Sequence, residues 1–273
     1  MARSCREPCY QFGMDWKHPG RSGAIVYAIA ASVLSVAATA VTRLTIAKRK
    51  GRATAVARLP PGPVIVISNH ASHADGILLG LACRRMGRSI RFLTTSGVFQ
   101  APVLGPLVRR VGFIPVERGS ASAGTSLNVA AEALAAGEVV GIFPEGRTTR
   151  DPNLWPERAK TGAVRLALKT GVPIVPIAMV GTHRVLPRKR RVLALIRNLL
   201  LRPNVVVEIG DPIDVVALAG EDPITPDRIR QLADQVMAEL VALVASVRGE
   251  TPPASPQGSS SADAGNRWPD PGS

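Results

Sequence analysis

Residues 64–75 read Val-Ile-Val-Ile-Ser-Asn-His-Ala-Ser-His-Ala-Asp (VIVISNHASHAD) and join an apolar run directly to a short polar patch. The apolar run is short and rich in β-branched residues, which predicts a buried strand over Val64–Ser68. The polar patch holds two of the four histidines of the chain and an aspartate. Because loops held by a rigid strand often carry functional side chains, we expect a functional site here.

Further apolar runs follow this strand and alternate with amphipathic segments. We expect strands at 90–94, 112–116, 139–143, 174–180 and 205–209, and helices at 77–86, 126–135 and 159–169. Gly171 stands where a helix C-cap is expected, and Thr225-Pro226 has the cap and first-turn residues of a final helix. Strands that alternate with helices predict an α/β fold, with a central sheet flanked by helices.

An uncharged apolar segment, Gly23–Thr42, precedes the predicted α/β region. Its 20 residues match the length of a bilayer-crossing helix, and Arg43, Lys48, Arg49, Lys50 and Arg52 follow it. A cleaved signal peptide and a soluble core helix are the alternatives. We expect an N-terminal membrane-anchoring helix, spanning or re-entrant. The basic residues after it predict a cell-membrane location with the folded domain on the cytoplasmic face.

These features divide the chain into three parts. Residues 1–57 form the leader and anchor helix, residues 58–248 the folded domain, and residues 249–273 a Pro/Ser/Gly-rich tail that we expect to be disordered. The three cysteines, Cys5, Cys9 and Cys83, form no recognisable disulfide framework, which is typical of a reduced compartment.

The chain is strongly basic, with 34 Lys and Arg residues against 20 Asp and Glu and a net charge of +14. This favours a polyanionic partner. Aromatic residues make up only 4% and no nucleic-acid-binding motif is present, so we expect no nucleic-acid partner. Residues 184–202 mix basic and apolar side chains without an acid, which predicts binding to an anionic membrane surface. A solvated loop followed by a buried helix is the alternative.

The spacing of His70 and Asp75 fits a general base and its orienting partner. Asp75 can accept a hydrogen bond from one ring nitrogen of His70, which leaves the other nitrogen free to take a proton. The chain has no G-x-S-x-G motif, so such a base would activate a hydroxyl of the substrate. A purely structural histidine is the alternative. His70 and His73 also form H-x-x-H, but no further ligand motif accompanies them and we expect no metal.

Three more motifs follow in order: residues 112–118 (GFIPVER), 143–147 (FPEGR) and 172–177 (VPIVPI). Together with Asn69, His70 and Asp75 they resemble the four blocks of the glycerolipid acyltransferase family, which includes the lysophosphatidic acid acyltransferases. The similarity extends roughly over residues 61–213. The resemblance therefore implies a glycerolipid-acyltransferase-like α/β sheet.

The resemblance also implies roles for individual residues. His70 would be the general base and Asp75 its orienting partner. Arg118, Glu145 and Gly146 would bind the glycerol phosphate of the acceptor. The co-substrate would be acyl-CoA or acyl-carrier protein, with no further cofactor.

The sequence departs from the family pattern at two positions. The arginine that often lies two places after the glycine of the third block is replaced by Thr148, so that Arg147 or Arg150 would supply this charge. Thr95 stands where a lysine is common. We expect acyl transfer from a thioester to a lysophospholipid, which would convert 1-acyl-glycerol 3-phosphate to phosphatidic acid. Another lysophospholipid, a polar lysolipid or glycerol 3-phosphate is the alternative acceptor, and an inactive basic lipid-binding protein is the alternative class.

Overall fold

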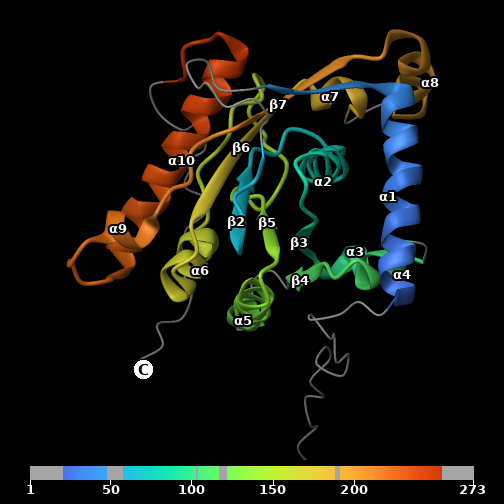
Figure 1. Ribbon diagram of the computed structural model, residues 1–273. Helices are drawn as coiled ribbons and strands as arrows, with labels where there is room; N and C mark the ends of the chain where they lie inside the picture. Colours follow the sequence, from blue (N-terminus) through green and yellow to red (C-terminus); the bar gives the residue numbers. More distant parts are fainter. Residues whose placement is uncertain (1–20, 48–57, 103, 117–121, 188–190, 254–273) are drawn as a thin grey trace, which may run out of the picture.

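The computed structural model describes residues 21–47, 58–102, 104–116, 122–187 and 191–253. Within these ranges a seven-stranded sheet forms the centre of the molecule, and helices cover both of its faces (Figure 1). The predicted α/β fold with a central sheet flanked by helices is therefore confirmed.

The strand order across the sheet is β1-β7-β6-β2-β5-β3-β4. The strands are β1 (Arg43–Ala47), β2 (Val64–Ser68), β3 (Ile90–Thr95), β4 (Ile114–Val116), β5 (Val139–Ile142), β6 (Ile174–Val180) and β7 (Asn204–Ile209). Neighbouring strands are parallel, except that β6 and β7 are antiparallel. The fully buried β2 lies between β5 and β6, so the strand that precedes the polar patch is central.

The edge strand β1 is not among the strands predicted from the sequence. Its sequence lies between the apolar N-terminal segment and a basic run. For this reason it is interpreted above as the basic flank of the predicted membrane anchor. Leu44 and Ile46 pack against the core, whereas Arg43 and Thr45 are exposed. This alternation of exposed and packed side chains is the signal of a half-buried strand.

The helices agree in part with the predicted ones. They are α1 (Arg21–Val41), α2 (Asp75–Arg85), α3 (Ser96–Gln100), α4 (Leu104–Arg110), α5 (Ser122–Ala135), α6 (Gly162–Thr170), α7 (Thr182–Val185), α8 (Arg191–Leu201), α9 (Val215–Ala219) and α10 (Pro226–Arg248). Gly171 ends α6 in the left-handed conformation, with φ of 68°. The Thr225 side chain accepts a hydrogen bond from the Arg228 N–H at the start of α10. The short helices α3, α4, α7 and α9 carry too few turns to show a helical period in the sequence.

Alternate side chains of β2 point into two different cores. Ile65 and Ile67 belong to the core under α5, α6, α9 and α10. Val64 and Val66 belong to the core under α2, against which the C-terminal part of α1 also packs. This period of two is the geometry of a strand, and here it makes β2 apolar on both faces.

The N-terminal apolar segment forms α1, as the sequence predicts for a helix. None of the helices in the described ranges combines the length and the apolar character that a membrane crossing requires. The predicted membrane anchor is not confirmed. The leader before Arg21 and the tail from residue 254 onward lie outside the described residues, and the predicted division into three parts stays a prediction.

Candidate functional site

The site lies where three neighbouring strands end. β2, β5 and β6 are parallel, so their carboxyl ends meet at the same edge of the sheet. The His70 loop follows β2, the Pro-Glu-Gly turn follows β5, and α7 follows β6. The first and third sequence motifs, which are far apart in the chain, therefore meet at this edge.

His70 and Asp75 form a hydrogen-bonded pair, with 2.8 Å between Nδ1 of His70 and Oδ2 of Asp75. Asp75 is the first residue of α2 and is fully buried. Its Oδ2 also accepts the Ser72 N–H at 2.7 Å. Because an ionised carboxylate only accepts hydrogen bonds, this contact favours the neutral tautomer in which Nδ1 of His70 donates and Nε2 carries the lone pair. The His70 side chain is 20% exposed, which leaves the ring accessible to a substrate.

The third motif holds His70 in place through both its ring and its backbone. The imidazole stacks on Phe143, with 4.3 Å between ring centroids and 22° between planes. The His70 N–H donates to Oε1 of Glu145 at 3.0 Å, and its carbonyl accepts from the Thr149 N–H at 2.7 Å. The position of the imidazole therefore depends on the loop after β5.

Glu145 lies buried beneath this loop and connects two backbone segments. Its Oε2 accepts the Glu157 N–H at 3.0 Å, while Oε1 accepts the N–H of His70. Burial raises the pKa of Glu145 from its usual 4.5 to about 8, against the opposing effect of the two N–H donors. The negative charges of Glu157 and Asp75 raise it further. The sequence predicts that Glu145 binds substrate, and this stays a prediction; the contacts that the carboxyl makes are with the protein backbone.

Asn69, the residue before His70, is anchored to the neighbouring strand β6 by its side chain. Its Nδ2 donates to the Met179 carbonyl at 2.9 Å and its Oδ1 accepts the Met179 N–H at 2.8 Å. This reciprocal pair continues the ladder between β2 and β6, whose last register pair is Ser68 and Ile177. The asparagine amide thus acts as a further backbone unit of the sheet.

Two basic side chains border the Pro-Glu-Gly turn. Gly146 has a positive φ of 70°, and a Cβ there would lie 3.1 Å from Cε of Lys160. Nη2 of Arg147 lies 2.9 Å from Oε2 of Glu157, and the Arg147 side chain is 38% exposed. Lys160 is a basic neighbour of the turn that the sequence analysis missed, because residues 147–159 separate it from Gly146. Arg118 lies in 117–121, outside the described residues.

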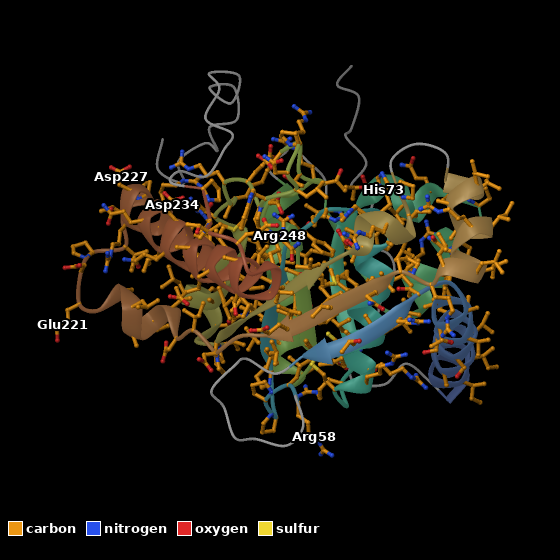
Figure 2. The ribbon with its side chains drawn as sticks, turned by 90° about the horizontal axis from the view of Figure 1, so that it is seen from above. Arg58, His73, Glu221, Asp227, Asp234 and Arg248 are labelled. Carbon is orange, nitrogen blue, oxygen red and sulfur yellow. The ribbon has the colours of Figure 1, made fainter. Side chains whose placement is uncertain are left out.

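The second histidine of the H-x-x-H pattern differs from His70 in its exposure. His73 is exposed, and Figure 2 places it on the side of the molecule that carries α8 and α1. Over the ranges that the structure describes, no group of three or more His, Cys, Asp or Glu side chains is arranged to hold a metal ion.

Neither Ser72 nor Cys83 is well suited to act as a nucleophile that would hold an acyl group at this site. The Ser72 hydroxyl donates to the Leu186 carbonyl at 2.8 Å. Cys83 is buried in the core beneath α2, where burial raises the pKa of its thiol to about 12. Because a thiol that stays protonated is a poor nucleophile, Cys83 is unsuited to hold an acyl group.

Comparisons with known proteins agree with this arrangement. A solved structure, the 1-acyl-sn-glycerophosphate (LPA) acyltransferase PlsC from Thermotoga maritima, has the same fold, with a TM-score of 0.54. The match covers 85% of this chain and 90% of that one, at 18% sequence identity. Residues 52–180 match the sequence model of the Acyltransferase family.

Two of the following sequence relatives are named as acyltransferases of the same kind, and a third is uncharacterized. The 1-acyl-sn-glycerol-3-phosphate acyltransferase BAT2 of Brassica napus chloroplasts is 36% identical over 126 residues, 46% of this chain and 35% of the relative. The Bacillus subtilis 1-acyl-sn-glycerol-3-phosphate acyltransferase is 30% identical over 118 residues, 43% of this chain and 55% of the relative. The uncharacterized protein ML2427 of Mycobacterium leprae is 29% identical over 218 residues, 66% of this chain and 57% of the relative.

These matches cover the part of the chain that holds the site. Residues 52–180 match the Acyltransferase family, and the chain resembles the glycerolipid acyltransferases, as its four sequence blocks predict. The chain spans about a third of the length of the plant relatives that it matches.

Replacing Asn69 by Ala should destabilise the whole sheet. The Asn69→Ala variant leaves the buried N–H and carbonyl of Met179 unpaired, and we expect a loss of about 2–4 kcal/mol in the free energy of unfolding. Urea denaturation measures it. The exposed Asn128→Ala variant, the matched control, should lose no more than about 1 kcal/mol. Equal losses in the two variants would contradict the role given to Asn69.

The raised pKa of Glu145 predicts a pH dependence of stability. Between pH 4.5 and about 8 the folded chain keeps a proton that the unfolded chain releases. The stabilisation from this group is therefore complete below pH 4.5 and is lost as the pH rises through 8, by at most about 1.4 kcal/mol per pH unit.

Glu145→Gln should remove this slope, because glutamine does not titrate. The free energy of unfolding would be measured in urea at intervals from pH 5 to 8. The exposed Glu239→Gln control should keep the slope of the parent protein. A parent slope that persists unchanged in Glu145→Gln would show that the titrating group is elsewhere.

Proposed function

We propose that this chain transfers a fatty acyl group from an acyl thioester to the hydroxyl of a lysophospholipid. The observation that carries the proposal is the 2.8 Å pair of His70 and Asp75, which leaves Nε2 of an accessible imidazole free to accept a proton. It lies in a domain that matches the Acyltransferase family. The donor is acyl-CoA or acyl-carrier protein.

The reaction proceeds by direct transfer. The acceptor hydroxyl donates to Nε2 of His70 and loses its proton to this atom as its oxygen attacks the thioester carbonyl. Asp75 stabilises the imidazolium that forms and keeps Nε2 directed at the substrate. The tetrahedral intermediate then expels the thiolate, which takes the proton back from Nε2. A new ester and a free thiol result, and His70 is neutral again.

The proposed acceptor is 1-acyl-glycerol 3-phosphate, with phosphatidic acid as product. The relatives named for this activity support this choice. Arg118, Glu145, Gly146 and Arg147 are the proposed acceptor-binding residues, with the guanidinium groups on the phosphate oxygens. Lys160, which lies against Gly146, adds a second described cation beside the turn. These cations compensate for the threonines at positions 95 and 148.

The acceptor is a lipid, so the enzyme works at a membrane. The net charge of +14 supports an anionic membrane surface as a partner. We place the protein at the cell membrane with the site facing the cytoplasm, on the basis of the basic residues that follow α1 in the sequence.

The test is a thiol-release assay with oleoyl-CoA and, in separate reactions, lysophosphatidic acid, another lysophospholipid or glycerol 3-phosphate. His70→Ala should lower turnover roughly 10²–10⁴-fold, the usual contribution of a general base. His73→Ala is the matched control and should keep nearly all of the activity.

The acceptor panel separates the outcomes. Release that depends on His70 and occurs with lysophosphatidic acid supports the proposed reaction. Release with a different lysolipid alone would keep the mechanism and refute the acceptor. No release with any acceptor, from acyl-CoA or acyl-carrier protein, would favour an inactive lipid-binding protein, and equal losses in the two histidine variants would refute His70 as the base.

Asp75→Asn should also reduce turnover, because an amide provides no negative charge to stabilise the imidazolium. We expect kcat to fall by roughly 10²-fold or more with a smaller change in KM. Steady-state kinetics with the preferred acceptor measure both constants, and circular dichroism confirms the fold. A loss confined to KM would contradict the orienting role.

A further inference from the structure

The helix α8 presents an apolar surface to solvent. Leu200 is 88% exposed, and the other large aliphatic residues of its outer surface are 57% to 72% exposed: Val192, Leu193, Ile196, Leu199 and Leu201. Only Ala194 and Asn198, one turn apart, face the protein as buried residues within Val192–Leu201. A surface helix of a globular protein normally has the opposite pattern, with its apolar stripe inward.

Basic residues flank and interrupt this apolar helix in the sequence. The stretch from Arg184 to Arg202 contains seven Arg and Lys residues and no Asp or Glu. Arg184 and Arg197 are exposed in the structure. In Figure 2 the labelled acidic residues Glu221, Asp227 and Asp234 lie on the side of the molecule opposite α8. The charge distribution therefore favours an anionic partner on the α8 side.

Exposed aliphatic side chains also occur on α1, whose C-terminal end lies next to α8 (Figure 1). Ile29, Val33 and Val36 of α1 are more than half exposed. The two helices are joined near their C-terminal ends, where Arg202 donates to the Thr39 carbonyl and the Thr42 hydroxyl donates to the Pro203 carbonyl. Two helices that contact each other thus both carry exposed aliphatic side chains.

Hydrogen bonds fix α8 relative to the site. Nδ2 of Asn198, on the buried face of α8, donates to the carbonyls of Arg184 at 2.9 Å and Val185 at 3.0 Å. The next residue, Leu186, accepts the Ser72 hydroxyl from the loop of the catalytic pair. A surface bound by α8 is therefore held at a defined position relative to His70.

We propose that α8, together with the exposed side of α1, docks the protein onto an anionic lipid bilayer by inserting the aliphatic side chains of α8 between the headgroups. The inference rests on the proposed function, because a lysolipid acceptor lies in that bilayer. Aliphatic side chains with basic residues and no acid fit the headgroup region of anionic lipids. Docking in this orientation brings the bilayer to the edge of the sheet where His70 lies.

The docking test is flotation with vesicles of equal parts phosphatidylglycerol and phosphatidylcholine, and with phosphatidylcholine alone. The double variant Leu193→Glu with Leu200→Glu should bind the anionic vesicles about tenfold more weakly or worse, because two aliphatic contacts are replaced by charges of the lipid's sign. Arg197→Glu should weaken binding to the anionic vesicles and leave the weak binding to neutral ones unchanged.

A matched control places the same substitutions on the opposite side. Leu218 on α9 and Ile224 in the loop after it are exposed aliphatic residues, and Leu218→Glu with Ile224→Glu should bind like the parent protein. Unchanged flotation of the α8 variant, equal losses in both double variants, or failure of the parent protein to float with anionic vesicles would each overturn the docking surface.

Turnover measurements with two acceptors distinguish a loss of membrane docking from a loss of the acyl-transfer reaction itself. The α8 double variant should lose about tenfold in turnover of a long-chain lysophospholipid in vesicles, but less than about twofold with a short-chain acceptor dissolved in water. Equal losses on both acceptors would overturn the orienting role of α8. If the parent protein floats through α8 but turns over neither acceptor, the docking surface stands and the proposed acyl transfer fails.

Discussion

The carboxyl group of Glu145 is the point on which the geometry of the site depends. It accepts one backbone N–H from the His70 loop and one from Glu157, and so joins the connections after β2 and β5. Without this group, both N–H donors would be buried and unpaired, at a cost of about 1–3 kcal/mol each. The same burial raises the pKa of Glu145, because the surrounding protein keeps water away from the carboxyl. The two N–H donors oppose this effect only in part.

The parallel pairing of β2 with its two neighbours brings the His70 loop close to Glu145. Because β5 and β6 run in the same direction as β2, the motifs that follow them arrive at one edge of the sheet. Asn69 extends the pairing to β6 beyond the last backbone rung, and Phe143 provides the stacking surface for the imidazole. A side chain that is fixed by packing and backbone hydrogen bonds loses little further freedom when a ligand binds, which favours the proposed role of His70.

Much of the fold could be predicted from local patterns. The strand before His70 has the residues expected from its apolar run, and the caps of α6 and α10 are given by Gly171 and Thr225. The pairing of His70 with Asp75 also follows from loop length and chemistry. Lys160 could not be found in this way, because its approach to Gly146 depends on how residues 147–159 fold back. The buried role of Glu145 was hidden for a similar reason: a sequence pattern does not distinguish a carboxylate that contacts substrate from one that contacts backbone.

The reversed direction of β7 has a consequence for how this domain can vary. Because β6 and β7 are antiparallel, the chain between them leaves and re-enters the sheet at the same edge. Residues 181–203 are thus an excursion within a hairpin connection, and α7 and α8 lie within it. Such an excursion can change in length or composition while every strand keeps its neighbours. The proposed docking helix α8 lies within this connection, so a change in the connection alters the proposed docking surface without changing the order of the strands.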